Sequence, residues 1–110
     1  MNRDIETFFS NIITLKNLSD TDIVPAGSSL IKLGEEYGEL CAAYLKRERE
    51  LNASASAEDN LEEEIVDTIM CALDIAFKSQ ISVTKLNETM HIKLQKWANK
   101  IKNTQSNSIY

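Results

Sequence analysis

The chain has 110 residues, of which 43% are hydrophobic, and it contains only 3 glycines and 1 proline. This length suffices for one domain and is too short for two, and the scarcity of glycine and proline favours long helices over a turn-rich β fold. The net charge of −5 argues against a broad basic face that binds nucleic acid polymers.

Membrane and secretory signals are not evident in the sequence. No apolar run approaches the length of a membrane span, and the N-terminus lacks the apolar core of a signal peptide. Cys41 and Cys71 lie inside helical apolar patterns, which favours buried free thiols over a disulfide. We therefore expect a cytoplasmic protein with no membrane partner.

Apolar spacing predicts a first helix over about residues 3–18. A connector that contains Pro25 follows it. The second helix is predicted to begin after Ser28 or Ser29, either of which can cap it, and to end near residue 50. Its apolar seam has the spacing of a packed helix, with members Leu30, Leu33, Tyr37, Leu40 and Tyr44.

The third helix is predicted from Asn60 to about Ser79, after a polar connector at residues 52–59. Glu63 occupies the position of a capping-box acid, three residues after Asn60. Two apolar stripes run along this helix, so we expect other helices to surround it, from this chain or from another subunit.

A fourth helix is predicted after Ser82 or Thr84 as its cap, and residues 103–110 are predicted to form a polar, frayed tail. Its apolar seam contains Val83, Leu86, Met90, Leu94, Trp97 and Ile101. Because one chain offers more apolar helix surface than four short helices can cover, we expect a homodimer or a tetramer.

Two motifs each place a pair of acids three residues apart, Glu36 with Glu39 and Glu64 with Asp67. Residues at this spacing share a helix face, so each motif points two carboxylates in one direction beside an apolar seam. If the two helices pack together, four carboxylates meet. Unit charges about 4 Å apart repel by roughly 4 kcal/mol at an effective dielectric near 20. Such a cluster needs a cation, protons or distance, and oxygen-rich sites suit Mg²⁺ or Mn²⁺.

Residues 32–40, Lys-Leu-Gly-Glu-Glu-Tyr-Gly-Glu-Leu, resemble the first motif of the MazG-like nucleotide pyrophosphohydrolases. Residues 63–67, Glu-Glu-Ile-Val-Asp, resemble the second, and residues 93–97, Lys-Leu-Gln-Lys-Trp, resemble the closing helix of many members. The resemblance implies a four-helix bundle of the all-α NTP pyrophosphatase type, completed by oligomerisation. The whole chain, 1–110, is expected to be one such domain, with its core at about 3–102.

The resemblance also implies Mg²⁺-dependent hydrolysis of a nucleoside triphosphate to the monophosphate and pyrophosphate, in a house-cleaning role. Mn²⁺ is an expected substitute. The metal ligands it implies are the acids of the two motifs, Glu36, Glu39, Glu64 and Asp67. Glu35 is a candidate general base. Phosphate binding also requires positive charge, and the candidates are Lys32, Lys96 and Lys100.

Three alternative functions differ from this prediction. One is hydrolysis of a phosphoribosyl-nucleotide by a related enzyme. Another is a non-catalytic helical module that binds metal or a protein partner through exposed acids. The third, a di-iron carboxylate bundle, requires repeated Glu-x-x-His motifs, and the sequence contains a single copy that ends at its one histidine, His91.

Overall fold

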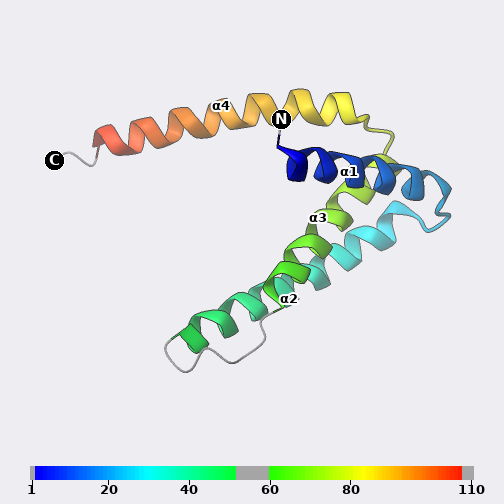
Figure 1. Ribbon diagram of the computed structural model, residues 1–110, viewed down its shortest axis with the longest axis horizontal. Helices are drawn as coiled ribbons and strands as arrows, with labels where there is room; N and C mark the ends of the chain where they lie inside the picture. Colours follow the sequence, from blue (N-terminus) through cyan, green and yellow to red (C-terminus); the bar gives the residue numbers. More distant parts are fainter. Residues whose placement is uncertain (1, 52–59, 108–110) are drawn as a thin grey trace. The chain divides into compact units, whose positions relative to one another are not determined.

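The structure, a computed structural model, describes residues 2–51 and 60–107. The predicted connector at residues 52–59 and the end of the predicted tail lie outside the described residues. The described regions form four helices and contain no strand, which confirms the predicted all-α class. The helices are α1 (Arg3–Thr21), α2 (Ala26–Leu51), α3 (Leu61–Lys78) and α4 (Val83–Asn107) (Figure 1).

The chain divides into two compact units, residues 1–80 and residues 81–110. The first unit holds α1, α2 and α3, and the second holds α4. Within the first unit α3 is the central helix, because it packs against both α1 and α2. None of the four helices in the described regions is long and apolar enough to cross a membrane.

Helix α1 begins where the sequence predicts, and the Asn2 side chain accepts a hydrogen bond from the backbone N–H of Asp4 at 2.7 Å. It ends at Thr21, beyond the predicted residue 18. The extra turn is polar, so apolar periodicity did not reveal it. An ion pair between Lys16 and Asp20 at 2.8 Å spans this turn on the helix surface.

The predicted start of the second helix was wrong. Helix α2 begins at Ala26, directly after Pro25, so Ser28 and Ser29 lie inside the first turn and do not cap it. Proline is tolerated directly before a helix because the N–H that it lacks would have no helical partner there. The N–H of Ser28 donates to the carbonyl of Pro25 at 3.0 Å, which closes the first turn.

Helices α2 and α3 pack antiparallel, as predicted (Figure 1). Two contacts establish the direction. Ser29, near the start of α2, donates a hydrogen bond to Asp74 near the end of α3. Glu36, about two turns further along α2, lies beside Glu64 and Asp67 in the first half of α3. This arrangement brings the two acidic motifs together.

The termini of α3 agree closely with the prediction. Asn60 is the N-cap residue, but its side chain makes no capping hydrogen bond, so the predicted capping box with Glu63 does not form around it. At the other end Gln80 has a φ of 65°, a left-handed conformation that often terminates a helix. Among the described residues of the first unit, the buried apolar side chains all belong to this helix, namely Leu61, Cys71, Ala76 and Phe77.

Helix α4 begins after Ser82, whose hydroxyl accepts a hydrogen bond from the N–H of Lys85 at 3.0 Å, so Ser82 is the cap. The helix continues through Asn107, and the predicted frayed tail is wrong up to that residue. No glycine or proline lies between Lys102 and Asn107 to end the helix. Most of the apolar seam of α4 is exposed, including Trp97 at 63%, whereas Leu86 is half-buried.

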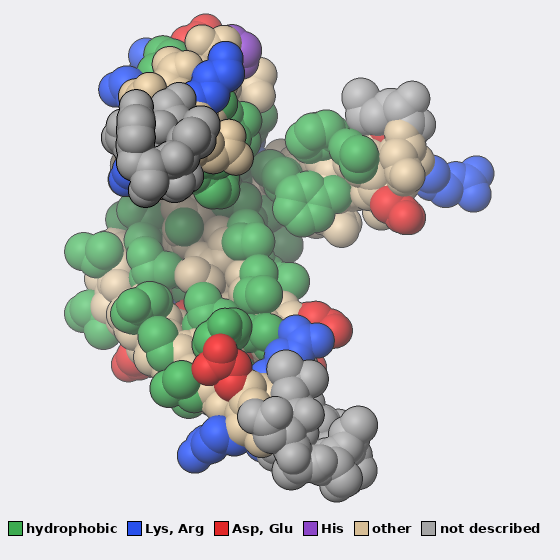
Figure 2. Space-filling model, turned by 90° about the vertical axis from the view of Figure 1, so that its left-hand side faces the viewer, with side chains coloured by type: hydrophobic (Ala, Val, Ile, Leu, Met, Phe, Trp, Pro, Cys, Tyr) green, Lys and Arg blue, Asp and Glu red, His purple; other side chains and the backbone are tan. Residues whose placement is uncertain are grey.

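Large hydrophobic side chains also remain exposed on the first unit. Ile31 of α2 is 70% exposed and Ile13 of α1 is 56% exposed. Even central α3 leaves Val66 and Met70 nearly half exposed. Figure 2 shows hydrophobic side chains over much of the face in view. The buried core is therefore small for the apolar content of the chain.

Candidate metal centre

The acidic motifs meet where α2 crosses α3. Glu36, Glu64 and Asp67 each offer one carboxylate oxygen, and these three atoms all lie within 4.8 Å of one another. Glu36 comes from α2, whereas Glu64 and Asp67 come from successive turns of α3. The predicted convergence of the two motifs is thus observed.

Burial distinguishes this cluster from an ordinary acidic surface. Glu36 is only 7% exposed, although most glutamates of the chain are exposed. Its Oε2 atom and the Oε2 atom of Glu64 are buried and have no hydrogen-bond partner. Buried acceptors without partners are rare in proteins and costly, and they often mark a place where an ion or water binds.

The pKa values of the cluster reflect this environment. Burial is the largest cause that raises the pKa of Glu36 above its usual value, followed by the negative charges of Glu39 and Asp67. Burial is also the main cause that raises the pKa of Glu64, followed by the adjoining carboxyl of Glu39. A cation bound among these carboxylates would replace their repulsion by attraction.

Glu39 completes the predicted set. It is exposed, yet it lies close enough to Glu36 and Glu64 to raise the pKa of both. Three of the four predicted ligands, Glu36, Glu64 and Asp67, thus offer oxygens close to one another, and Glu39 lies beside two of them. Carboxylate oxygens without sulfur or imidazole suit a hard cation such as Mg²⁺.

One predicted basic residue lies at this centre. Lys32, one turn before Glu36, is close enough for its positive charge to oppose the rise in the Glu36 pKa. Lys96 and Lys100 belong to α4, in the second unit, and their role in substrate binding stays a prediction. Glu35 is exposed on α2, next in sequence to Glu36 and therefore turned about 100° from it around the helix. Its role as a general base also stays a prediction.

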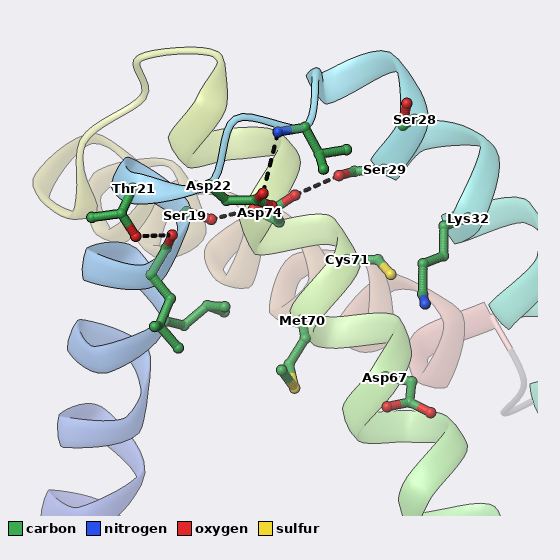
Figure 3. Close-up of a pocket in the computed structure, with 13 residues that line it drawn as sticks. Ser19, Thr21, Asp22, Ser28, Ser29, Lys32, Asp67, Met70, Cys71 and Asp74 are labelled. Atoms are coloured by element: carbon green, nitrogen blue, oxygen red, sulfur yellow. Dashed lines mark hydrogen bonds between the residues drawn. The ribbon is translucent and has the colours of Figure 1, made fainter.

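A pocket of about 630 Å³ adjoins the acidic cluster at Asp67, within the first unit (Figure 3). Asp67 and Lys32 line it near the acidic cluster, and Cys71 and Asp74 continue its wall along α3. Further lining residues come from α1, the connector and α2, namely Leu15, Leu18, Ser19, Thr21, Asp22, Val24, Ser28 and Ser29, together with Met70 of α3. A volume of this size is typical of small-molecule sites.

Asp74 is the functional candidate that sequence reasoning missed. Ser19 of α1 donates a hydrogen bond to its Oδ1 and Ser29 of α2 donates one to its Oδ2 (Figure 3). Lys78 lies 3.1 Å from Oδ2 and also pairs with Asp22 at 2.8 Å. One carboxylate thereby joins all three helices of the first unit.

The hydrogen bonds determine the charge of Asp74. Burial acts to raise its pKa, but the bonds from Ser19, Ser29 and Lys78 outweigh burial, and the pKa is lowered. The pKa of Asp22 is lowered as well, chiefly by its bond from Lys78. Asp74 could have been noticed because it follows Asp67 by seven residues, two helical turns, and so continues the same polar strip of α3.

Comparisons with protein-family models, with curated proteins and with solved structures found nothing that matches this chain.

Proposed function

We propose that this protein is a Mg²⁺-dependent nucleoside triphosphate pyrophosphohydrolase of the MazG-like type. The single observation that carries the proposal is the pair of buried oxygens without partners, Oε2 of Glu36 and Oε2 of Glu64, inside a cluster of three carboxylates. A purely structural cluster would satisfy these atoms with hydrogen-bond donors.

Each residue of the centre has a role in this proposal. Glu36, Glu39, Glu64 and Asp67 would hold Mg²⁺, with Mn²⁺ as a substitute. When bound there, the ion would supply positive charge for the phosphate oxygens and would lower the pKa of a water. Lys32 supports the same phosphates from α2. The adjoining pocket takes the nucleoside, because its walls combine apolar side chains with a few polar groups, as nucleoside sites require.

The reaction is a hydrolysis at the α-phosphorus. A water oxygen forms a bond to this atom while the bond to the oxygen that bridges to the β-phosphorus breaks. The products are the nucleoside monophosphate and pyrophosphate, and a proton leaves the attacking water. Glu35 remains our candidate to accept that proton. A role in cleaning the cytoplasmic nucleotide pool, as first predicted, belongs to this proposal.

Oligomerisation is part of the same proposal. The exposed apolar residues of α1 and α2, such as Ile13 and Ile31, favour burial in a subunit interface. We propose a homodimer or tetramer in which these faces complete the core of a four-helix bundle. A nucleic acid polymer is not expected as a partner, because the chain is acidic.

The test is release of pyrophosphate from a panel of ribo- and deoxynucleoside triphosphates with Mg²⁺, with Mn²⁺ and with chelator. We expect release that chelator abolishes. The panel includes a phosphoribosyl-nucleotide triphosphate, because preferential hydrolysis of that compound would favour the related enzyme instead. Absence of hydrolysis for all compounds, together with no effect of metal on the melting temperature, would favour a non-catalytic interaction module.

A further inference from the structure

We infer that Ser19, Ser29 and Asp74 form the part of the pocket that recognises the nucleobase, and that they select a base with an amino group on its Watson–Crick edge. This inference rests on the proposed function and names the substrate class of the same site. It follows from where these residues lie and from the direction of their hydrogen bonds.

The position of Asp74 relative to the metal centre suits contact with a base. Asp67 and Asp74 line one pocket, with Cys71 between them on the same helix (Figure 3). Seven residues of α-helix rise by about 10 Å. Because the phosphates belong at Asp67 and Lys32, the sugar and then the base extend along the pocket toward Asp74.

The hydrogen bonds of this part of the pocket run in one direction. Ser19 and Ser29 both donate their hydroxyl protons to Asp74, and Thr21 donates its hydroxyl proton to the carbonyl of Leu18 at 2.9 Å. A hydroxyl has one proton to donate. Toward a ligand these three hydroxyls therefore present lone pairs and can only accept.

Two donors near Asp74 already have acceptors. The Lys78 side chain is 9% exposed and contacts both Asp22 and Asp74, and it is not among the described residues that line the pocket. The N–H of Val24 donates to Asp22 at 3.2 Å. An ionised Asp74 adds further acceptor capacity, because a carboxylate has about four lone-pair positions.

Hydroxyl and carboxylate groups that can only accept hydrogen bonds distinguish an amino group from a carbonyl group on a ligand. An amino group of adenine or cytosine donates to it, and a bond to the charged network is stronger than a neutral one. The carbonyl oxygen at the same position of hypoxanthine or uracil meets acceptors and is repelled. Sites built for a hydrogen bond reject a ligand that cannot make it far more strongly than apolar sites do.

The first experiment compares substrates that differ at this group. We measure kcat/KM for dATP against dITP and for dCTP against dUTP with Mg²⁺. The expected result is a preference of about tenfold or more for the amino compound in at least one pair. Parity in both pairs, or a preference for the carbonyl compound in both, overturns the inference.

The second experiment changes the direction of the hydrogen bonds. In Asp74→Asn the side-chain amide can donate to a serine hydroxyl, which frees that hydroxyl proton for the ligand, so the preference moves toward the carbonyl compound. In Ser29→Ala one acceptor is lost and the ratio falls toward one. Ser10→Ala, at an exposed position of α1 away from the residues that line this pocket, is the control and keeps the wild-type ratio.

A ratio of two substrates separates recognition from damage to the fold. Loss of structure lowers kcat/KM for both members of a pair and leaves their ratio unchanged. If Asp74→Asn does not fold, Ser29→Ala decides, and an unchanged ratio there overturns the inference. Hydrolysis without base preference rejects only this inference, whereas absence of hydrolysis for every nucleotide rejects the proposed function with it.

Discussion

A carboxylate oxygen of Glu36 on α2 lies within 4.8 Å of a carboxylate oxygen of Glu64 on α3, and each residue keeps a buried oxygen without a hydrogen-bond partner. The two acids are thus held together by helix packing although their charges repel. Both pKa values are raised, mainly by burial. In such a site, protonation of a carboxylate or binding of a cation lowers the electrostatic free energy relative to the fully ionised cluster.

The first prediction concerns metal and stability. We expect Mg²⁺ to bind the folded cluster and to find no such site in the unfolded chain, so Mg²⁺ is expected to raise the melting temperature. At a free concentration of 100 times the Kd the stabilisation is about 2.7 kcal/mol, which corresponds to an increase of about 10 °C. Calorimetry measures it, with Na⁺ at matched ionic strength as the control. An unchanged melting temperature at saturating Mg²⁺ would remove the cluster from consideration as a metal site.

The second prediction concerns turnover. Glu39 is exposed at the edge of the cluster, so Glu39→Gln is expected to keep the fold. The substitution removes the negative charge of one proposed metal ligand. We expect kcat/KM to fall by roughly 100-fold or more, as removal of metal-site partners commonly does. Glu62→Gln, an exposed acid in the first turn of α3 outside the cluster, is the matched control and retains activity. Full activity of Glu39→Gln would exclude it as a ligand.

Much of the site follows from the sequence because it depends on local spacing. Acids three residues apart share a helix face wherever the helix lies, and an antiparallel pairing of α2 and α3 is enough to bring the motifs of Glu36 and Glu64 together. The apolar seams likewise predict the helices. Apolar periodicity could not predict helix boundaries that are formed by polar residues, such as the last turn of α1, which ends at Thr21.

The hydrogen-bond network of Asp74 could not be predicted for a different reason. Its partners Ser19 and Ser29 are far from it in sequence, and small hydroxyl residues occur in most connectors. The sequence predicts Ser19 in the connector and Ser29 at or next to the cap of the second helix. Both positions lie inside helices in the structure, because α1 ends later and α2 begins earlier than the apolar spacing predicts. Only the packing of α1 and α2 against α3 shows that these hydroxyls point at one carboxylate.

The third prediction concerns pH in the absence of metal. Glu36 and Glu64 have folded-state pKa values above the ordinary 4.5. Their contribution to stability is therefore fully present below pH 4.5 and is lost as the pH rises through the raised values, because the unfolded chain ionises first. Urea unfolding across this range shows a falling free energy of unfolding. Glu36→Gln is expected to make this free energy depend less steeply on pH. An equally steep dependence in that variant would contradict the assignment of the effect to Glu36.

Asp22 and Asp74 have the opposite sign in the same titration. Their folded-state pKa values lie below the ordinary 3.8. Their contribution is present above pH 3.8 and is lost as the pH falls through the lowered values. The two aspartates therefore affect the free energy of unfolding at lower pH than Glu36 and Glu64 do. We expect Mg²⁺ to change the pH dependence only in the range of the two glutamates.

The fourth prediction concerns the stability of the first unit. Asp74→Ala removes the acceptor shared by Ser19, Ser29 and Lys78 and leaves the buried Ser19 hydroxyl without it. Loss of hydrogen bonds to a charged group costs about 2 kcal/mol or more, so the melting temperature falls by about 8 °C. Ser28→Ala changes a hydroxyl outside this network and is the control. Equal stability of Asp74→Ala and the wild type would show that the network does not join the helices.

The fifth prediction concerns self-association. A monomer of 12.4 kDa would leave Ile31 at 70% and Ile13 at 56% exposure, together with the apolar seams of which they are part. Monomeric proteins rarely expose large continuous apolar patches, so sedimentation equilibrium is expected to give the mass of a dimer or tetramer. Ile13→Lys with Ile31→Lys lowers that mass by placing charges in the interface, whereas Arg49→Gln, at an exposed polar position of α2, leaves it unchanged. A mass of 12.4 kDa for the wild type at every concentration tested would reject association through these faces.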